Sequence, residues 1–289
     1  MNADSTFHIG SSHAICQDYS LAGVSPPAVR SEELGLLPST PYVILSDGCS
    51  SSPDTDVGAR LLVKAAEQVM RDFGSTSARD PAEIHTQAAR LALTWAELLR
   101  LPPQAVDATL LTAHLDGEEL IIGCSGDGVI CLETRAGAID VYSISYASGY
   151  PLYPAYTHQP ARLLSLKDGG RDGKEVKHFR SASVAERLRP VGASGGDSPT
   201  EVFAIRAQDY KYAALISDGV HSFFRAARTG VGARGEAIPL EEVLPELVSF
   251  KSTRGAFVGR RMKRFMKDCL DRGWQHADDL ALGALYLGG

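Results

Sequence analysis

The sequence is poor in the features that place a protein in a membrane or in an oxidising compartment. Its 289 residues include five cysteines, an odd number without a C-x-x-C pair, so a disulfide framework is not indicated. No apolar stretch approaches the ~20 residues that a membrane-spanning helix needs. The first ten residues, MNADSTFHIG, lack the basic and apolar regions of a signal peptide. We therefore expect a cytoplasmic protein with reduced thiols and no membrane contact.

An excess of positive charge is also missing. The 29 Lys and Arg residues are outnumbered by 35 Asp and Glu residues, which gives a net charge of −6. A general nucleic-acid-binding surface is therefore not indicated. Hydrophobic residues make up 44% of the chain, enough for a substantial core. No internal repeat or linker divides the sequence, and we expect one monomeric domain over residues 1–289.

What the sequence does contain is a set of acidic residues beside short apolar runs. These segments are YVILSDG at 42–48, LIIGCSGDG at 120–128, AALISDG at 213–219 and HADDLALGALYL at 276–287. Short runs rich in Ile, Leu and Val are typical of buried strands. A carboxylate at the end of each strand would be brought to one rim of a sheet. Such carboxylates repel each other unless hard divalent cations with oxygen ligands lie among them.

The remaining pattern predicts an α+β fold with layered antiparallel sheets. Asp116-Gly117 and Ala136-Gly137 separate closely spaced strands and predict hairpin turns. Asp80 is a candidate N-cap for a helix that starts at Pro81. A polar, Pro-containing loop is expected after residue 21, up to Pro41. Residues 146–199 lack sustained periodicity and are interpreted as an irregular, flap-like insertion. The expected helices are 57–73, 81–101, 240–250 and 256–271. The expected strands are 7–9, 18–21, 42–47, 109–114, 119–125, 129–133, 139–143, 201–206, 212–218 and 280–287.

Three of the acids, together, predict a metal site. Asp47, Asp218 and Asp278 come from three different strand ends, and Gly48 could add its backbone carbonyl. Such an all-oxygen site selects magnesium or manganese over zinc. Two such ions can share a bridging water, lower its pKa and clamp a phosphoryl oxygen.

Six short motifs follow one another along the chain, namely Gln17-Asp18, Asp47-Gly48, Asp107-Ala108-Thr109, Gly126-Asp127-Gly128, Ser217-Asp218-Gly219 and Asp278-Asp279. Their order resembles that in the metal-dependent type 2C (PPM) protein phosphatases. The resemblance extends over residues 8–287, and the chain resembles a compact bacterial-style member. Each motif alone is weak, because Asp-Gly is a common turn dipeptide, but six in order are specific.

The resemblance implies a four-layer α-β-β-α sandwich of two antiparallel sheets flanked by helix pairs. It also implies hydrolysis of phosphoserine and phosphothreonine in proteins by a water that bridges two divalent cations, manganese or magnesium. Asp47 would bridge both ions, Asp218 and Asp278 would hold one, and the Gly48 carbonyl would hold the other. The partners implied are phosphorylated proteins, the targets of a serine/threonine kinase, and not nucleic acid or membrane.

Two further acids match the family by position. Asp18 would act through coordinated water, and Asp127 would help to bind a third, weaker metal ion together with Asp218. Asp279 stands where the family often has Asn.

Two departures from the family pattern concern the reaction itself. His13 occupies the place of an Arg that grips the substrate phosphate, and it would be a weaker, pH-sensitive contact. A plain hydrogen-bonded loop histidine is the alternative. Cys49 stands where animal members carry a His proposed as the general acid; bacterial members commonly lack that His.

Two other functions remain open from the sequence. A pseudophosphatase would keep the fold and bind phosphoproteins or a partner without turnover; the complete carboxylate set argues against it, whereas His13 and Cys49 keep it open. A haloacid-dehalogenase-type phosphatase needs D-x-D at the end of its first strand. Here YVILSDGCS has none, and Asp54-x-Asp56 lies in a Ser/Pro loop.

One basic cluster is separate from the acidic motifs. Arg260, Arg261, Lys263, Arg264 and Lys267 alternate with apolar residues between 257 and 267. This pattern is typical of the solvated face of an amphipathic helix. A docking surface for an acidic partner is the alternative.

Overall fold

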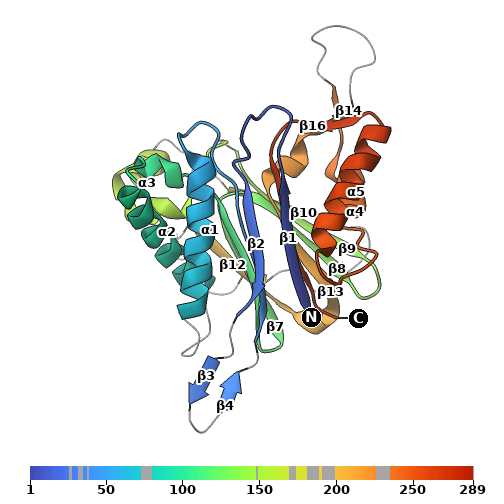
Figure 1. The fold of residues 1–289 in the computed structure, drawn as a ribbon, viewed down its shortest axis with the longest axis horizontal. Coiled ribbons are helices and arrows are strands. Elements are labelled where there is room, and N and C mark those ends of the chain that lie inside the picture. The colour runs from blue at the N-terminus through green and yellow to red at the C-terminus, as the bar shows by residue number, and fades with distance from the viewer. Residues whose placement is uncertain are drawn as a thin grey trace.

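The protein is described by a computed structural model in which four layers of helices and sheets are stacked (Figure 1). The structure describes residues 1–25, 28–31, 35–37, 39–72, 80–147, 149–168, 174–180, 189–190, 199–225 and 235–288. Helices α1 and α2 cover one side of two facing sheets, and α4 and α5 cover the other side. The α-β-β-α sandwich expected from the sequence is therefore confirmed.

The first six-stranded sheet has the order β11-β12-β7-β6-β5-β2. All its pairings are antiparallel. Gly117 has φ +61° in the turn between β6 and β7, so Asp116-Gly117 is a hairpin turn as predicted. The strands are β2 (Tyr19–Val24), β5 (Pro41–Ser46), β6 (Leu110–Asp116), β7 (Glu119–Ser125), β11 (Arg189–Pro190) and β12 (Thr200–Arg206).

The second six-stranded sheet has the order β1-β17-β13-β8-β9-β10 and is also antiparallel throughout. Its strands are β1 (Asn2–His8), β8 (Gly128–Thr134), β9 (Ile139–Tyr146), β10 (Lys174–Arg180), β13 (Tyr210–Ile216) and β17 (Leu280–Tyr286). Two small sheets accompany these two. They are formed by β3 (Ala28–Ser31) with β4 (Gly35–Leu37), and by β14 (Phe223–Arg225), β15 (Glu236–Ala237) and β16 (Trp274–His276).

The helices follow the apolar periodicity of the sequence. The Asp80 side chain accepts a hydrogen bond from the Ala82 amide (2.9 Å), which confirms it as the cap of α2. The helix ends at Leu98 and not at Leu101, because Arg100 has φ +58° and two prolines follow. The helices are α1 (Thr55–Asp72), α2 (Pro81–Leu98), α3 (Pro160–Asp168), α4 (Leu240–Leu247) and α5 (Phe257–Asp271), with short 3-10 turns η1 (Pro103–Val106), η2 (Pro154–His158), η3 (Ala207–Asp209) and η4 (Asp218–Ser222).

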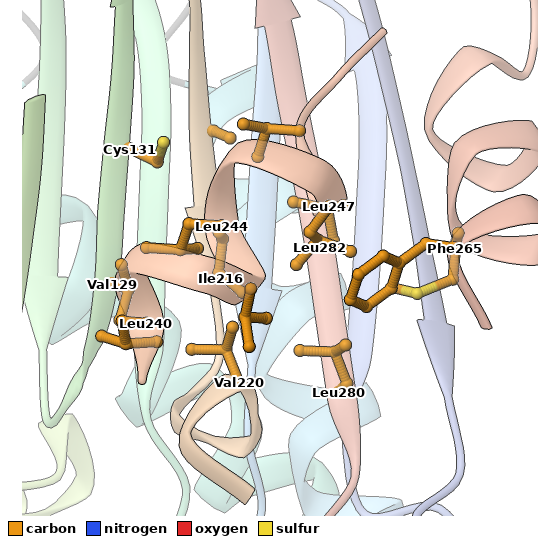
Figure 2. Packing of buried hydrophobic residues seen from close by; sticks show 14 of the residues in the cluster. Val129, Cys131, Ile216, Val220, Leu240, Leu244, Leu247, Phe265, Leu280 and Leu282 are labelled. Carbon is orange, nitrogen blue, oxygen red and sulfur yellow. The ribbon is translucent and has the colours of Figure 1, made fainter. Parts of the chain in front are cut away.

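Three apolar clusters hold the layers together. One lies between the two sheets, one between the first sheet and α1 and α2, and one between the second sheet and α4 and α5. Figure 2 shows the last of these, where leucines of α4 and Phe265 of α5 pack on Val129, Ile216 and Leu282. The sheets approach closely at Gly283 of β17, where a Cβ atom would lie 2.2 Å from Cγ1 of Val43 in β5.

Two expectations about irregular regions were wrong in part. The segment before Pro41, interpreted as a loop, contains the β3–β4 pair. The insertion 146–199 contains η2, α3 and two strands: β10 pairs with β9 along its whole length, and β11 pairs with β12. Residues 148, 169–173, 181–188 and 191–198 of this insertion lie outside the described residues.

Within the described part of the chain, no helix combines the length and the apolarity needed to span a bilayer.

Candidate metal and phosphate site

Four of the sequence-selected aspartates line one cavity of about 200 Å³. Asp47 follows β5 of the first sheet, and Asp127 lies between β7 and β8, where the chain passes from one sheet to the other. Asp218 follows β13, and Asp278 precedes β17, both in the second sheet. The two sheets therefore bring acids from four separate segments to one place. The cavity is also lined by Gly48, Cys49, Ser50, Ser51, Thr109, Gly149, Pro151 and Tyr153.

The Asp47 segment is fixed by the start of the neighbouring strand. The Asp47 amide donates to Oγ1 of Thr109 (2.9 Å), and the Thr109 amide donates to the Asp47 carbonyl (2.8 Å). Ser46 Oγ donates to the Thr109 carbonyl (2.6 Å), and Gly48 forms an isolated bridge with Ala108. These contacts explain why the Asp47-Gly48 and Ala108-Thr109 motifs occur together, because each satisfies the backbone of the other.

The Asp218 segment is fixed against the start of β17. The Ser217 amide donates to the Ala281 carbonyl (3.0 Å), and Ser217 Oγ accepts from the Ala281 amide (2.8 Å). A Cβ atom on Gly219 would lie 1.7 Å from the Asp279 carbonyl oxygen, so only glycine fits this approach. The glycine of this SDG motif thus lets two acidic segments pack backbone to backbone.

Asp18 lies behind the cavity and is almost fully buried. Its Oδ2 accepts a hydrogen bond from Ser217 Oγ (2.6 Å), whereas its Oδ1 is buried with no hydrogen-bond partner among the described residues. Burial, and further the charge of Asp218, raise the pKa of Asp18 to about 7, against the opposing effect of the Ser217 hydrogen bond. The pKa of Asp47 is raised well above its usual value by burial and then by the charges of Asp18 and Asp218.

The other acids of the cavity behave in the same way. Burial, followed by the charge of Asp218, raises the pKa of Asp127 to about 7. The same two causes, in the same order, raise the pKa of Asp278 above its usual value. The carboxylates therefore oppose each other's ionisation, and a cation among them would reverse that effect.

The donor chemistry fits hard divalent cations. The acids that line the cavity offer carboxylate oxygens, Gly48 offers a carbonyl, and Asp18 adds a buried carboxylate oxygen without a hydrogen-bond partner among the described residues. In the part of the chain that the structure describes, no three His, Cys, Asp or Glu side chains are already arranged as a metal site. The fit therefore rests on the type and charge of the donors.

Asp279 and His13 lie together beside the cavity. Asp279 Oδ1 accepts from the Gly10 amide (2.8 Å), and its Oδ2 accepts from the Gln17 amide (2.6 Å). His13 Nδ1 is 2.8 Å from Asp279 Oδ2, and its Nε2 is 3.5 Å from Oδ1 of Asp278. The hydrogen bond with Asp279 raises the pKa of His13. Asp279 thus anchors the segment that carries His13 and Asp18.

Sequence reasoning missed the aromatic wall of the cavity. Tyr153 lines it from the insertion, and its ring packs against Tyr156 with centroids 5.4 Å apart. Burial alone would raise the pKa of the Cys49 thiol, but hydrogen bonds with Ser51 and Tyr153 lower it. The only sequence signal was the run GYPLYPAY, whose tyrosines are dense but lack a strand or helix period.

An ion pair between a buried Asp and a partly exposed Arg also escaped prediction. The Arg162 guanidinium of α3 donates to both carboxylate oxygens of Asp107, at 2.8 and 2.7 Å. Asp107 Oδ2 also accepts from Ser52 Oγ (2.9 Å), and the Asp107 carbonyl accepts from the Cys49 amide (2.9 Å). The pair therefore connects the insertion to the loop after Gly48.

Comparisons with known proteins agree with this architecture. The sequence matches a family model described as Protein phosphatase 2C over residues 8–229. No curated protein matches the chain. The fold is similar to serine/threonine phosphatase Stp1 from Staphylococcus aureus, with a TM-score of 0.57, 12% identity, and coverage of 100% of this chain and 96% of that chain. A bacterial serine phosphatase gives a TM-score of 0.55 at 13% identity, over 100% of this chain and 98% of that chain.

Proposed function

Because this chain belongs to the protein phosphatase 2C family, we propose that it hydrolyses phosphoserine and phosphothreonine in proteins with the help of divalent metal ions. The observation that carries the proposal is the cavity in which Asp47, Asp127, Asp218 and Asp278 meet. The substrates proposed are phosphorylated proteins, the targets of a serine/threonine kinase.

The proposed ions are manganese or magnesium, two or three in number. Asp47, Asp218, Asp278 and the Gly48 carbonyl would hold two of them, and Asp127 with Asp218 would hold a third. When bound, the ions supply positive charge that lowers the pKa of water and neutralises phosphoryl oxygens. The raised pKa values of Asp47, Asp127 and Asp278 support this assignment, because these groups gain most from a neighbouring cation.

The other residues of the site would orient these groups. Ser217 and Thr109 hold the Asp18 side chain and the Asp47 backbone through hydrogen bonds. We propose that Asp18 acts through coordinated water from behind the cavity, in keeping with its unpartnered Oδ1. His13, beside Asp278, is proposed to contact the substrate phosphate.

A cytoplasmic, monomeric enzyme is part of the same proposal. All five cysteines are free thiols, which agrees with a reducing compartment.

Metal-dependent turnover tests the proposal. Wild-type protein, freed of metal with EDTA, should hydrolyse a phosphothreonine peptide only after addition of Mn²⁺ or Mg²⁺. Asp47→Asn and Asp218→Asn should each lower kcat at least about 100-fold (~2.7 kcal/mol) because they remove a proposed metal ligand. Asp116→Asn, in an exposed hairpin turn, is the matched control and should leave kcat unchanged.

Calorimetric titration with Mn²⁺ provides a readout independent of turnover. Asp47→Asn should weaken Mn²⁺ binding, whereas Asp116→Asn should not. Phosphopeptide binding without turnover at any metal concentration would contradict the proposal and would identify a pseudophosphatase.

A further inference from the structure

Helix α5 has one buried face and one basic face. Phe257, Val258, Met262, Phe265, Met266 and Cys269 are buried in the cluster beneath the helix. Arg260, Lys263, Arg264 and Lys267 are exposed on the other side. Their spacing of three and four residues places them in one stripe about 10 Å long. The chain as a whole carries a net charge of −6, so this stripe is a local reversal of sign.

The stripe leads into a cavity of about 160 Å³ at the start of the helix. Arg260 and Arg264 line it together with Arg261 and Lys251. The remaining lining consists of two hydroxyl and two aromatic side chains, namely Ser249, Ser252, Phe250 and Phe257. Four cations and two hydroxyls surround a space large enough for a carboxylate or a phosphoryl group, beside an aromatic wall.

The positive charge of this cavity is poorly compensated within the described part of the chain. Arg261 lies 3.7 Å from Asp268 and donates to the Glu246 carbonyl (2.7 Å). Burial, and further the charge of Arg264, lower the pKa of Arg261. Among the described residues, Arg260, Arg264, Lys251, Lys263 and Lys267 form no ion pair with an acid.

The cavity lies at the opposite end of the second sheet from the aspartate cavity. Asn2 Nδ2 donates to the Thr253 carbonyl (2.8 Å), and Asp4 Oδ2 accepts from the Val258 amide (2.6 Å). Asn2 pairs with Tyr286 at the end of β17, whereas Asp278 precedes its start. One strand length of about 20 Å therefore separates the two regions, and Figure 1 shows α5 alongside β1. An occupant of the basic cavity would leave the aspartate cavity open.

We propose that the basic cavity and stripe of α5 form a docking site for an extended acidic segment of a partner protein. Carboxylates would bind the guanidinium groups of Arg260 and Arg264, and then Lys263 and Lys267 along the stripe. Nη2 of Arg260 already donates to the Arg254 carbonyl (2.6 Å), which holds this guanidinium in place and leaves its other N–H groups for a ligand. An apolar side chain of the segment would rest on Phe250. The stripe is about 10 Å long, which is longer than a single small anion, so a chain that carries several anionic groups in a row matches it better. The narrow stripe, in a chain of negative net charge, favours a peptide over nucleic acid.

Fluorescence anisotropy with a fluorescein-labelled peptide tests this docking site. The peptide carries four Glu residues around one Leu, and the full chain is titrated in EDTA at about 50 mM NaCl, where charge screening is modest. Without metal or phosphate, the result does not depend on the proposed phosphatase activity. Wild-type protein should bind this peptide but not its Gln-substituted version.

Two double variants of equal net charge show whether the peptide binds at α5. Arg260→Ala/Arg264→Ala should raise the Kd at least about tenfold, and Ala suits both helical positions. Lys64→Ala/Arg90→Ala removes two exposed charges from α1 and α2 and should change the Kd less than about twofold. Both variants should retain wild-type p-nitrophenyl phosphate turnover, because none of these residues lies in the aspartate cavity.

Several results would overturn the proposal. These are no binding to wild type, an equal loss of affinity in both double variants, or equal binding of the Gln-substituted peptide. If single-stranded DNA bound more tightly than the acidic peptide, with the same dependence on Arg260 and Arg264, the ligand of this site would be nucleic acid and not an acidic peptide. If the protein self-associated in sedimentation experiments and Arg260→Ala/Arg264→Ala abolished this, the partner at this site would be a second copy of the chain.

Discussion

Removal of the Arg162 guanidinium should destabilise the protein, because the carboxylate of Asp107 would lose its charged partner. Asp107 is only 2% exposed, and Arg162 supplies two of its hydrogen bonds. In Arg162→Ala, only Ser52 Oγ would still donate to this carboxylate from a side chain. A buried charge without its partner raises the free energy of the folded state.

The magnitude follows from the burial of the two partners. Breaking a fully buried ion pair by removing one partner costs about 3–5 kcal/mol. The Arg162 side chain is 35% exposed, so water can reach part of the vacated site and replace some of the lost hydrogen bonding. We expect Arg162→Ala to lower the free energy of unfolding by about 2–3 kcal/mol. The guanidinium also packs 4.7 Å above the Tyr156 ring, and loss of this contact acts in the same direction.

Urea denaturation followed by circular dichroism measures this change, with Arg90→Ala as the control for loss of an exposed arginine. A double-mutant cycle with Asp107→Asn should give a coupling energy of at least about 1 kcal/mol. A free energy of unfolding within about 0.5 kcal/mol of wild type, as expected for an exposed pair, would refute the reasoning.

Three further predictions concern the aspartate cavity. Gly219→Ala should destabilise the protein by at least about 2 kcal/mol, because its Cβ would meet the Asp279 carbonyl. The control Gly259→Ala, whose Cβ would have no atom nearer than 3.9 Å, should be neutral or stabilising. Equal shifts of the melting temperature in the two variants would contradict this. In metal-free protein the pKa of Asp18 rises from 3.8 to about 7 on folding, so the stability that this group contributes is present below pH 3.8 and is lost as pH rises towards 7. Between about pH 4.5 and 6.5, this group should lower the free energy of unfolding of the wild type by about 1 kcal/mol per pH unit, and Asp18→Asn should abolish that contribution. Urea denaturation in EDTA measures both pH profiles, and parallel profiles for the two proteins would disprove the prediction. His13→Arg should lower the KM for a phosphothreonine peptide at alkaline pH, where imidazole is neutral and guanidinium is charged; an unchanged KM would argue against the phosphate contact.

The parts of the fold that were predictable from sequence are those with a strong local signal. The strand Glu119–Ser125 was predicted to the residue, because its apolar run is bounded by a turn on one side and a Gly-Asp-Gly step on the other. The convergence of Asp47, Asp218 and Asp278 was also predicted, because each acid adjoins the end of a buried strand and the order of the motifs resembles that of a known family.

The parts that were missed depend on distant partners. Strand β10, KEVKHFR, is rich in charge and lies at the edge of its sheet, so it has no apolar run to reveal it. The Arg162–Asp107 pair joins residues 55 positions apart. Asp107 belongs to a sequence motif, but nothing around Arg162 marks it as the partner of that carboxylate. His13 was predicted as a phosphate contact from its position alone, and its two aspartate neighbours became visible only in three dimensions.

The close approach of Gly283 to Val43 has a consequence for protein engineering. β5 leads directly to Asp47, and β17 begins two residues after Asp278, so the thickness of the hydrophobic interior at this point sets how far apart those two acids can lie. A larger side chain at position 283 would push the strands apart without touching any residue of the cavity. Thermostabilising substitutions that fill the interior of this sandwich therefore need to be screened for the proposed metal binding as well as for melting temperature.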